Sequence, residues 1–386
     1  MLSKEIQEEA ITFAQEVVRA NSLSGHEDKV ARVIEQKMRT LGYDQVEIDA
    51  FGNVIGKRFG KHPGPTILFD GHMDVVPVTN LDTWRSDPFA AEIYDGKIWG
   101  RGTSDMKGPL SAAVIALGHV PAEDIYGTLV VSGSIGEEMH EGAALEKVMA
   151  QVHPDFVVIC EPNGCCLGIG QKGRAGIWVE VFGKPAHSSV PHLGDNAMYK
   201  AVRVIDCLHQ MPLPSDPVLG NGVMELIDGI SSPYPSLSTI PVSFRMRYDR
   251  RLMHTETMES VLESIRLTLA DLPDWEADFQ QIKIQTYTGK SLEAPDFHPG
   301  WLMDPNNTWI QKAYKGLQKA GITPTYTTAL FCTNGSYSAG IAGVPTMIFG
   351  PSTGLLAHCV NENIEIADLL QGVEGYMGLA TELGRA

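Results

Sequence analysis

Apolar runs that alternate with helical patterns constrain the fold of this chain more than any other feature. Buried-strand patterns occur at residues 66–69, 128–132 and 156–160, and helix patterns at 109–117 and 143–151 separate them. Strands joined by helical crossovers predict a parallel α/β sheet with flanking helices.

The pattern changes near residue 172. Between 172 and 290 the expected order is strand, helix, strand, strand, helix, strand, with 281–289 as the last strand. This order is typical of the split-βαβ, ferredoxin-like arrangement. Because α/β character returns afterwards, we expect one α/β domain, residues 1–171 and 291–386, interrupted by an inserted α+β domain, residues 172–290.

Two local motifs suggest specific structures. Ser24 to Glu27 match a capping box that would open a helix over residues 29–41. Gly168, Gly170 and Gly173 match the dinucleotide-binding fingerprint, which requires a helix to follow. A strand pattern follows instead, and this argues against nucleotide binding.

The composition limits the partners and the compartment. The chain has 47 acidic and 30 basic side chains and a formal net charge of −17, which argues against nucleic acid and anionic membranes as partners. We see no secretory signal pattern and no window of 18 apolar residues. The six cysteines include no C-x-x-C pair, so we expect free thiols rather than a disulfide framework. Together these features predict a cytoplasmic protein.

Ionisable side chains follow each of the three buried strand patterns. His72 and Asp74 come after the first, Glu137 and Glu138 after the second, and Glu161 after the third. Ligand sites form beyond the carboxyl ends of parallel strands, so we expect these side chains to converge. Taken singly, each also has a structural interpretation, such as a helix cap or a solvated helix start.

Asp105 and His358 extend this set of candidates. Carboxylates packed together without counter-charge raise one another's pKa, and two divalent cations would reverse that cost. The imidazoles of His72 and His358 would complete a nitrogen and oxygen donor set suited to zinc or a similar first-row metal. Asp74 could orient the His72 ring. The combination predicts a dinuclear metal site.

Five motifs, in this order along the chain, resemble those of the M20 metallopeptidases. They are GHMDVVP, GRGTSDMKG, the GEE triplet, CEP and AHCVNE, and the inserted domain adds GKPAHSSVPHLGDNA. The resemblance covers the whole chain. It implies a catalytic domain interrupted by a ferredoxin-like lid and dimerisation domain.

The resemblance also implies a role for each candidate. Asp105 would bridge two metal ions, His72 and Glu161 would complete the first site, and Glu138 and His358 would complete the second. The metal ions would be zinc, with cobalt or manganese as alternatives.

The catalytic roles follow from the same resemblance. Asp74 would orient His72, and Glu137 would be the general base toward a water activated by the metals. His187 corresponds to a lid histidine that reaches the reacting oxyanion, often from the partner subunit; the alternative is a loop histidine bonded to its own backbone.

Candidate substrate contacts are Arg250, Arg251 and Asn334. In related lids an arginine from this strand holds a substrate carboxylate, whereas local pairing with acids such as Asp249 is the alternative. Asn334 lies in a loop, Cys332 to Ser336, that departs from the usual form.

The resemblance therefore implies a homodimeric, metal-dependent hydrolase that cleaves the amide of a small N-acyl amino acid, as deacetylases and desuccinylases do. A dipeptidase or carboxypeptidase and an N-carbamoyl amidohydrolase share this chemistry and stay open. A non-catalytic amino-acid- or peptide-binding protein is the alternative of another class.

Overall fold

The computed structural model describes residues 2–385 and divides into two compact units. Unit 1 comprises the chain up to Gln171, Lys283–Glu293 and the chain from Leu302 onward, and unit 2 comprises Lys172–Ile282 and Ala294–Trp301. Unit 2 begins where the sequence pattern changes. The inserted domain was expected to end at residue 290, whereas unit 2 leaves out Lys283–Glu293 and ends at Trp301.

The helices of unit 1 are α1 (Lys4–Arg19), α2 (Asp28–Thr40), α3 (Lys107–His119), α4 (Ala143–Val152), α7 (Thr308–Lys319) and α8 (Ile366–Leu383). Its main sheet contains β1 (Gln45–Ile48), β2 (Val54–Phe59), β3 (His62–His72), β6 (Tyr126–Ser134), β7 (Phe156–Ile159), β8 (Leu167–Gln171), β19 (Tyr326–Ala329) and β20 (Thr346–Ile348). A smaller sheet contains β4 (Glu92–Tyr94), β5 (Lys97–Trp99) and β21 (Asn363–Glu365).

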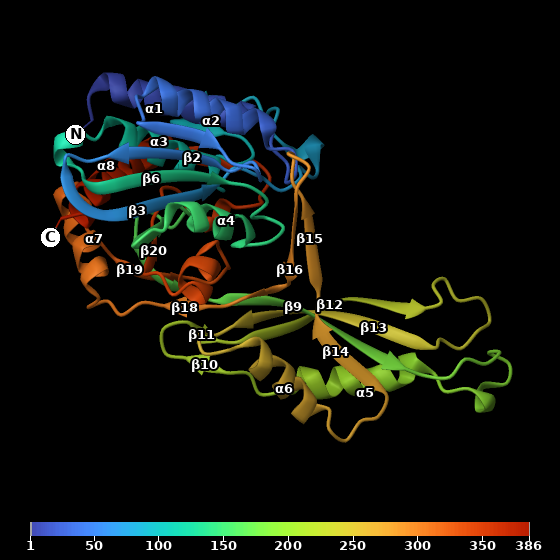
Figure 1. The fold of residues 1–386 in the computed structure, drawn as a ribbon. Coiled ribbons are helices and arrows are strands. Elements are labelled where there is room, and N and C mark those ends of the chain that lie inside the picture. The colour runs from blue at the N-terminus through green and yellow to red at the C-terminus, as the bar shows by residue number, and fades with distance from the viewer. Residues whose placement is uncertain (1, 386) are drawn as a thin grey trace. The chain divides into compact units, whose positions relative to one another are not determined.

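The main sheet has a parallel centre, as the sequence predicted. Its strand order includes β1-β2-β6-β3-β7-β20-β8, and the four consecutive strands β6, β3, β7 and β20 are parallel to one another. Figure 1 shows β2, β6 and β3 side by side in this sheet. The β1–β2 hairpin adds antiparallel strands at one edge. The expected α/β class is confirmed.

Helix α3 is buried on all sides, because it packs between the sheet and the helices α1 and α8. Its residues from Lys107 to Leu117 are all buried. An apolar run without a polar face is what such a position requires.

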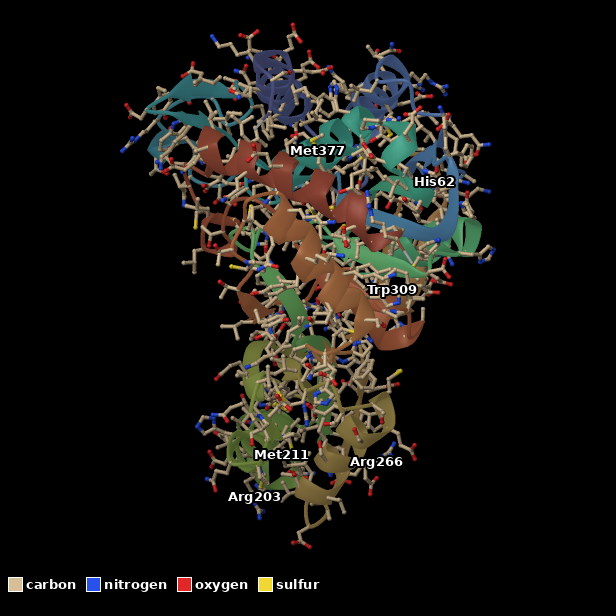
Figure 2. All side chains as sticks on the ribbon, turned by 90° about the vertical axis from the view of Figure 1, so that its left-hand side faces the viewer. His62, Arg203, Met211, Arg266, Trp309 and Met377 are labelled. Atoms are coloured by element: carbon tan, nitrogen blue, oxygen red, sulfur yellow. The ribbon has the colours of Figure 1, made fainter. Side chains whose placement is uncertain are left out.

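Helices α7 and α8 approach each other closely through glycines. A Cβ added at Gly316 would lie 2.7 Å from the carbonyl oxygen of Gly378, so side chains at this contact would force the helices apart. Figure 2 shows the two helices side by side, with Trp309 on α7 and Met377 on α8.

Unit 2 has the predicted ferredoxin-like arrangement. It contains β9 (Gly173–Phe182), α5 (Ala197–His209), β10 (Ser215–Asp216), β11 (Gly220–Asn221), β12 (Val223–Ser232), β13 (Ser243–Leu252), α6 (Met258–Thr268), β14 (Trp275–Phe279) and β17 (Phe297–His298). The sheet order β12-β13-β9-β14 is antiparallel throughout, and its core joins residues such as Val179, Val204 and Ile265 from β9, α5 and α6.

The prediction that residues 281–289 form the last strand of this domain was wrong. The fourth strand of the sheet is β14, and residues 281–289 instead supply β15 (Gln281–Gln285), which pairs with β16 (Ser291–Pro295). β18 (Trp301–Leu302) follows. Both segments have strand-like patterns, and only their long-range partners decide which one joins the sheet.

The prediction of a capping box at Ser24 to Glu27 was also wrong. Helix α2 begins at Asp28, and Glu27 makes no side-chain cap hydrogen bond. The Ser24 hydroxyl donates to Asp74 Oδ2 at 2.6 Å, and Glu27 Oε1 accepts from the backbone N–H groups of Gly25 and Gly136. Ser24 therefore bonds a residue distant in sequence, whereas Glu27 accepts from one local N–H group and one distant N–H group.

The predictions about the cysteines, the glycine motif and membrane-spanning helices agree with the structure of residues 2–385. The six cysteines are all free thiols. Gly168 and Gly170 lie in β8, and Gly173 starts β9 rather than a helix. Within residues 2–385 no helix is both long enough and apolar enough to cross a membrane.

Candidate metal centre

Three neighbouring parallel strands bring the candidate side chains to one edge of the main sheet. His72 ends β3 opposite Ser134, which ends β6, and β7 lies on the other side of β3. Glu137 and Glu138 follow β6, and Glu161 follows β7. The convergence that strand polarity predicted is therefore present in the structure.

Two groups of three potential ligands share Asp105. His72, Asp105 and Glu161 form one group, Asp105, Glu138 and His358 form the other, and within each group the ligand atoms lie within 4.8 Å of one another. Asp105 Oδ1 lies 3.1 Å from His72 Nε2, and its Oδ2 lies 3.4 Å from His358 Nε2. The two oxygens of one carboxylate therefore face the two groups.

The remaining distances within the groups are also short. His72 Nε2 lies 3.6 Å from Glu161 Oε1, and His358 Nε2 lies 2.9 Å from Glu138 Oε2. His72 is buried, whereas the His358 side chain is 54% exposed, so the second group opens to solvent.

The orientation of His72 is set by the backbone of Asp74. Its Nδ1 lies 2.9 Å from the Asp74 carbonyl oxygen, which can only accept, so Nδ1 carries a proton and Nε2 is the ring nitrogen that faces Asp105 and Glu161. The Asp74 carboxylate lies farther from Nδ1, at 3.5 Å.

The Asp74 carboxylate instead holds the turn after β6. It accepts hydrogen bonds from the backbone N–H groups of Glu137 at 3.0 Å and Glu138 at 3.2 Å, and from the Ser24 hydroxyl. Sequence analysis did not predict these hydrogen bonds to Asp74. It assigned Ser24 to a local capping box instead.

The charges of the centre are poorly compensated by protein groups alone. Burial and neighbouring carboxylates raise the pKa of Glu161 and of Glu137 well above the usual range, and burial together with the Asp105 charge raises the pKa of Glu138 to about 7. Hydrogen bonds to Asp105 and Glu138 raise the pKa of His358 to about 10.

This donor set fits divalent cations. Glu138 Oε1 is buried and has no hydrogen-bond partner among residues 2–385, as expected for an oxygen that serves as a ligand. Cations would replace the protons that these acids otherwise retain. Imidazole and carboxylate donors suit zinc and its first-row neighbours.

Glu137 lies beside the first group without belonging to it. Its Oε2 is 3.7 Å from His72 Nε2, and the residue is only 6% exposed. Its carboxylate therefore lies next to the first group, on the side of the His72 Nε2 atom.

His187 lies in unit 2, on an exposed loop. Its Nδ1 is 2.7 Å from Ser189 Oγ and accepts a hydrogen bond from the Ser189 backbone N–H. These bonds match the local alternative for this histidine, and its role at an oxyanion stays a prediction.

The three candidate substrate contacts have partners within the protein. Arg250 is 2% exposed and pairs with Glu256 at 2.6 Å, whereas Arg251 is one-third exposed and pairs with Asp249 at 2.9 Å. Local pairing, the alternative left open by the sequence, describes both arginines.

Asn334 is also buried and bonded. Its amide donates to Asp70 Oδ2 at 2.8 Å and to Ser134 Oγ at 3.0 Å, and its oxygen accepts from the Gly142 N–H. These bonds join the ends of β3 and β6 to the loop that contains Asn334.

Comparisons with known proteins agree with this architecture. A family model described as peptidase family M20/M25/M40 matches residues 68–382. The chain is 32% identical over 372 residues to the uncharacterized protein YgeY of Escherichia coli K12, covering 93% of this chain and 91% of YgeY. It is 29% identical over 378 residues to succinyl-diaminopimelate desuccinylase of Acidiphilium cryptum, covering 95% and 96%.

A solved structure has the same fold. The YXEP protein of Bacillus subtilis, described as a dinuclear metal binding peptidase from the M20 family, matches with a TM-score of 0.72 and 14% identity over 98% of each chain.

Proposed function

Because the chain belongs to peptidase family M20/M25/M40, we propose that it is a dinuclear-metal amidohydrolase that cleaves a small N-acyl amino acid. The family and its desuccinylase relative make the chain a hydrolase of amide or peptide bonds. The number of metals, the substrate class and the residue roles are the proposal.

One observation supports two metal ions above all others: the two ligand groups share Asp105, and each of its oxygens faces one group. His72 and Glu161 would hold one ion with Asp105, and Glu138 and His358 would hold the other. When bound, two divalent cations would acidify a water molecule and polarise the scissile carbonyl. Zinc is the proposed metal, with cobalt or manganese as alternatives.

Glu137 would act as the general base. It would take a proton from the attacking water through Oε2 and later give it to the leaving amine. Its raised pKa, which burial causes, favours holding that proton between the two steps. The hydrogen bond from its backbone N–H to Asp74 keeps the residue at the edge of the centre.

His187 would supply a hydrogen bond to the reacting oxyanion, from its own or the partner subunit. For the substrate carboxylate, Arg251 is the better candidate of the two arginines, because Arg250 is buried. The desuccinylase relative favours an N-acyl amino acid as substrate class.

A homodimer through unit 2 belongs to the same proposal. β12 is an edge strand of its sheet and exposes Leu226, Ile227 and Ile230. Exposed apolar edge strands commonly pair with another chain. Sedimentation of the metal-loaded protein would measure the assembly.

The test is a substrate panel with a matched variant. Metal-loaded protein and Glu137→Gln are incubated with N-acetyl, N-succinyl and N-carbamoyl amino acids and with dipeptides, and mass spectrometry follows the free amine. We expect wild type to hydrolyse an N-acyl amino acid and Glu137→Gln to retain both metals but to be about 10²–10⁴-fold slower.

Glu146→Gln, the same chemical change on a half-exposed residue of α4, is the control and should leave turnover unchanged. Comparable rates for Glu137→Gln and wild type would reject Glu137 as the base. Cleavage of dipeptides alone would move the substrate to the dipeptidase or carboxypeptidase class.

A further inference from the structure

A buried glutamate lies directly behind the shared ligand Asp105. Glu362 is fully buried, and its Oε1 accepts hydrogen bonds from the backbone N–H groups of Ser104 at 2.8 Å and Asp105 at 3.0 Å. One carboxylate oxygen therefore holds two consecutive peptide groups of the loop that presents the Asp105 side chain.

Arg101 extends this contact to His358. Its Nη1 pairs with Glu362 Oε2 at 2.6 Å, and its Nη2 donates to the His358 carbonyl oxygen at 3.4 Å. Arg101 is 2% exposed, and the ring of Trp84 lies 5.5 Å from its guanidinium carbon. The pair, here called the Arg101–Glu362 clamp, contacts the backbone of two candidate metal ligands.

The fold brings the two halves of the clamp together through a strand pair. β5 and β21 run antiparallel, with Trp99 opposite Asn363, and the Gly100 N–H donates to the Glu362 carbonyl oxygen at 2.9 Å. Arg101 and Glu362 therefore lie just beyond this pairing. The loop after β5 leads to Asp105, and the segment before β21 contains His358.

A second connection joins the same two segments. Ser104 Oγ lies 2.8 Å from Ser352 Oγ and donates to the Thr353 carbonyl oxygen at 3.1 Å. The loop with Asp105 and the segment with His358 thus contact each other through buried polar groups and not only through the ligands themselves.

Stability alone explains such a pair poorly. A buried ion pair contributes little net stability compared with apolar groups of the same volume, because both charges lose their hydration. We propose that the Arg101–Glu362 clamp is a positioning device, which fixes the backbone of Asp105 and His358 so that both ligand groups are preformed. This inference rests on the proposed dinuclear centre.

The two metal sites should depend unequally on the clamp. Of the three ligands in the second group, Asp105 and His358 both contact the clamp, whereas in the first group only Asp105 does. Loss of the clamp should therefore weaken the metal at the second group more. Removing the Glu362 charge would also leave the Arg101 cation uncompensated near that metal.

The experiment measures metal content and affinity, not turnover. Wild type, Glu362→Gln and Glu362→Ala are dialysed against graded chelator, and bound metal is counted by mass spectrometry. Loss of a group that orients a metal ligand typically weakens metal binding about 10- to 100-fold. We expect that loss for one of two metals in Glu362→Ala, and a smaller loss in Glu362→Gln, whose amide oxygen can still accept from the loop.

Unit 2 offers a matched control. Glu256 pairs with Arg250 at the same 2.6 Å, is similarly buried, and also accepts a backbone N–H, that of Met253. Glu256→Gln removes the same type of charge pair in the unit that contains no candidate ligand, so it should leave the metal content unchanged.

Other results would reject either the Arg101–Glu362 clamp or the dinuclear centre. Two metals bound by Glu362→Ala with wild-type affinity would overturn the clamp. Equal metal loss in Glu256→Gln would also overturn it, because that result would indicate general destabilisation. A wild type that binds no metal would reject the dinuclear centre itself.

Discussion

Glu27 lies fully buried beside the turn that contains Glu137 and Glu138, and it is not a candidate ligand. Its Oε1 accepts from the Gly25 and Gly136 N–H groups, whereas its Oε2 has no partner among the described residues. Burial, and then the charge of Asp74, raise its pKa from 4.5 to about 7.

This raised pKa makes stability depend on pH in a defined direction. Between pH 4.5 and about 7, the folded protein keeps the proton of Glu27 and the unfolded chain releases it. Stability therefore falls as pH rises through this window, by about 3 kcal/mol from this group, and the loss is complete above it.

Glu27→Gln should remove this dependence, because an amide does not ionise and its oxygen can still accept the two N–H groups. Urea unfolding of the chelated proteins at pH 5 and pH 8 measures the effect. We expect the stability of wild type relative to Glu27→Gln to be lower at pH 8 than at pH 5 by about 2.5 kcal/mol, because at pH 5 the unfolded chain has already released part of this proton. An equal stability difference between wild type and Glu27→Gln at pH 5 and at pH 8 would contradict the raised pKa of Glu27.

At the scale of elements, the start of α3 sets the position of Asp105. A Cβ added at Gly108 would lie 2.1 Å from the Thr103 carbonyl oxygen, which belongs to the loop just before the helix. The backbone of the helix and the loop can approach this closely only because residue 108 has no side chain.

Gly108→Ala should therefore push the loop away from α3 and displace Asp105. We expect a loss of about 1–3 kcal/mol in unfolding free energy and weaker metal binding. Gly118→Ala, near the other end of α3, has Leu41 side-chain atoms as its nearest neighbours, at 2.8 to 3.2 Å, so it should cost less than Gly108→Ala and leave metal binding unchanged. Chemical unfolding and metal titration measure both variants, and normal metal binding by Gly108→Ala would contradict this role of the glycine.

The elements that the sequence predicted are those with strong local patterns. β3, β6 and β7 have apolar runs that end in polar residues, so both their burial and the convergence of His72 and Glu161 could be predicted. The choice between β14 and residues 281–289 as the fourth strand of unit 2 depended on long-range pairing. The contacts of Ser24 with Asp74 and of Arg101 with Glu362 were equally inaccessible, because they join residues far apart in sequence.

At the scale of the whole molecule, the candidate ligands all belong to one unit. His72, Asp105, Glu138, Glu161 and His358 lie in unit 1, and unit 2 contributes none of them. A metal that binds only the folded state stabilises it, by about 2.7 kcal/mol at a concentration 100 times the Kd. The stabilisation should therefore appear in unit 1.

Hydrogen exchange of the chelated and metal-loaded proteins should resolve this difference along the chain. Without metal, the candidate ligands lose the bonds that would join these segments, so the ends of β3, β6 and β7 and the loop at 101–106 should exchange faster. Residues 172–282 of unit 2 should exchange at unchanged rates, because no candidate ligand lies among them. Faster exchange spread equally over both units would contradict a centre confined to unit 1 and would indicate that metal binding stabilises the chain as one cooperative body.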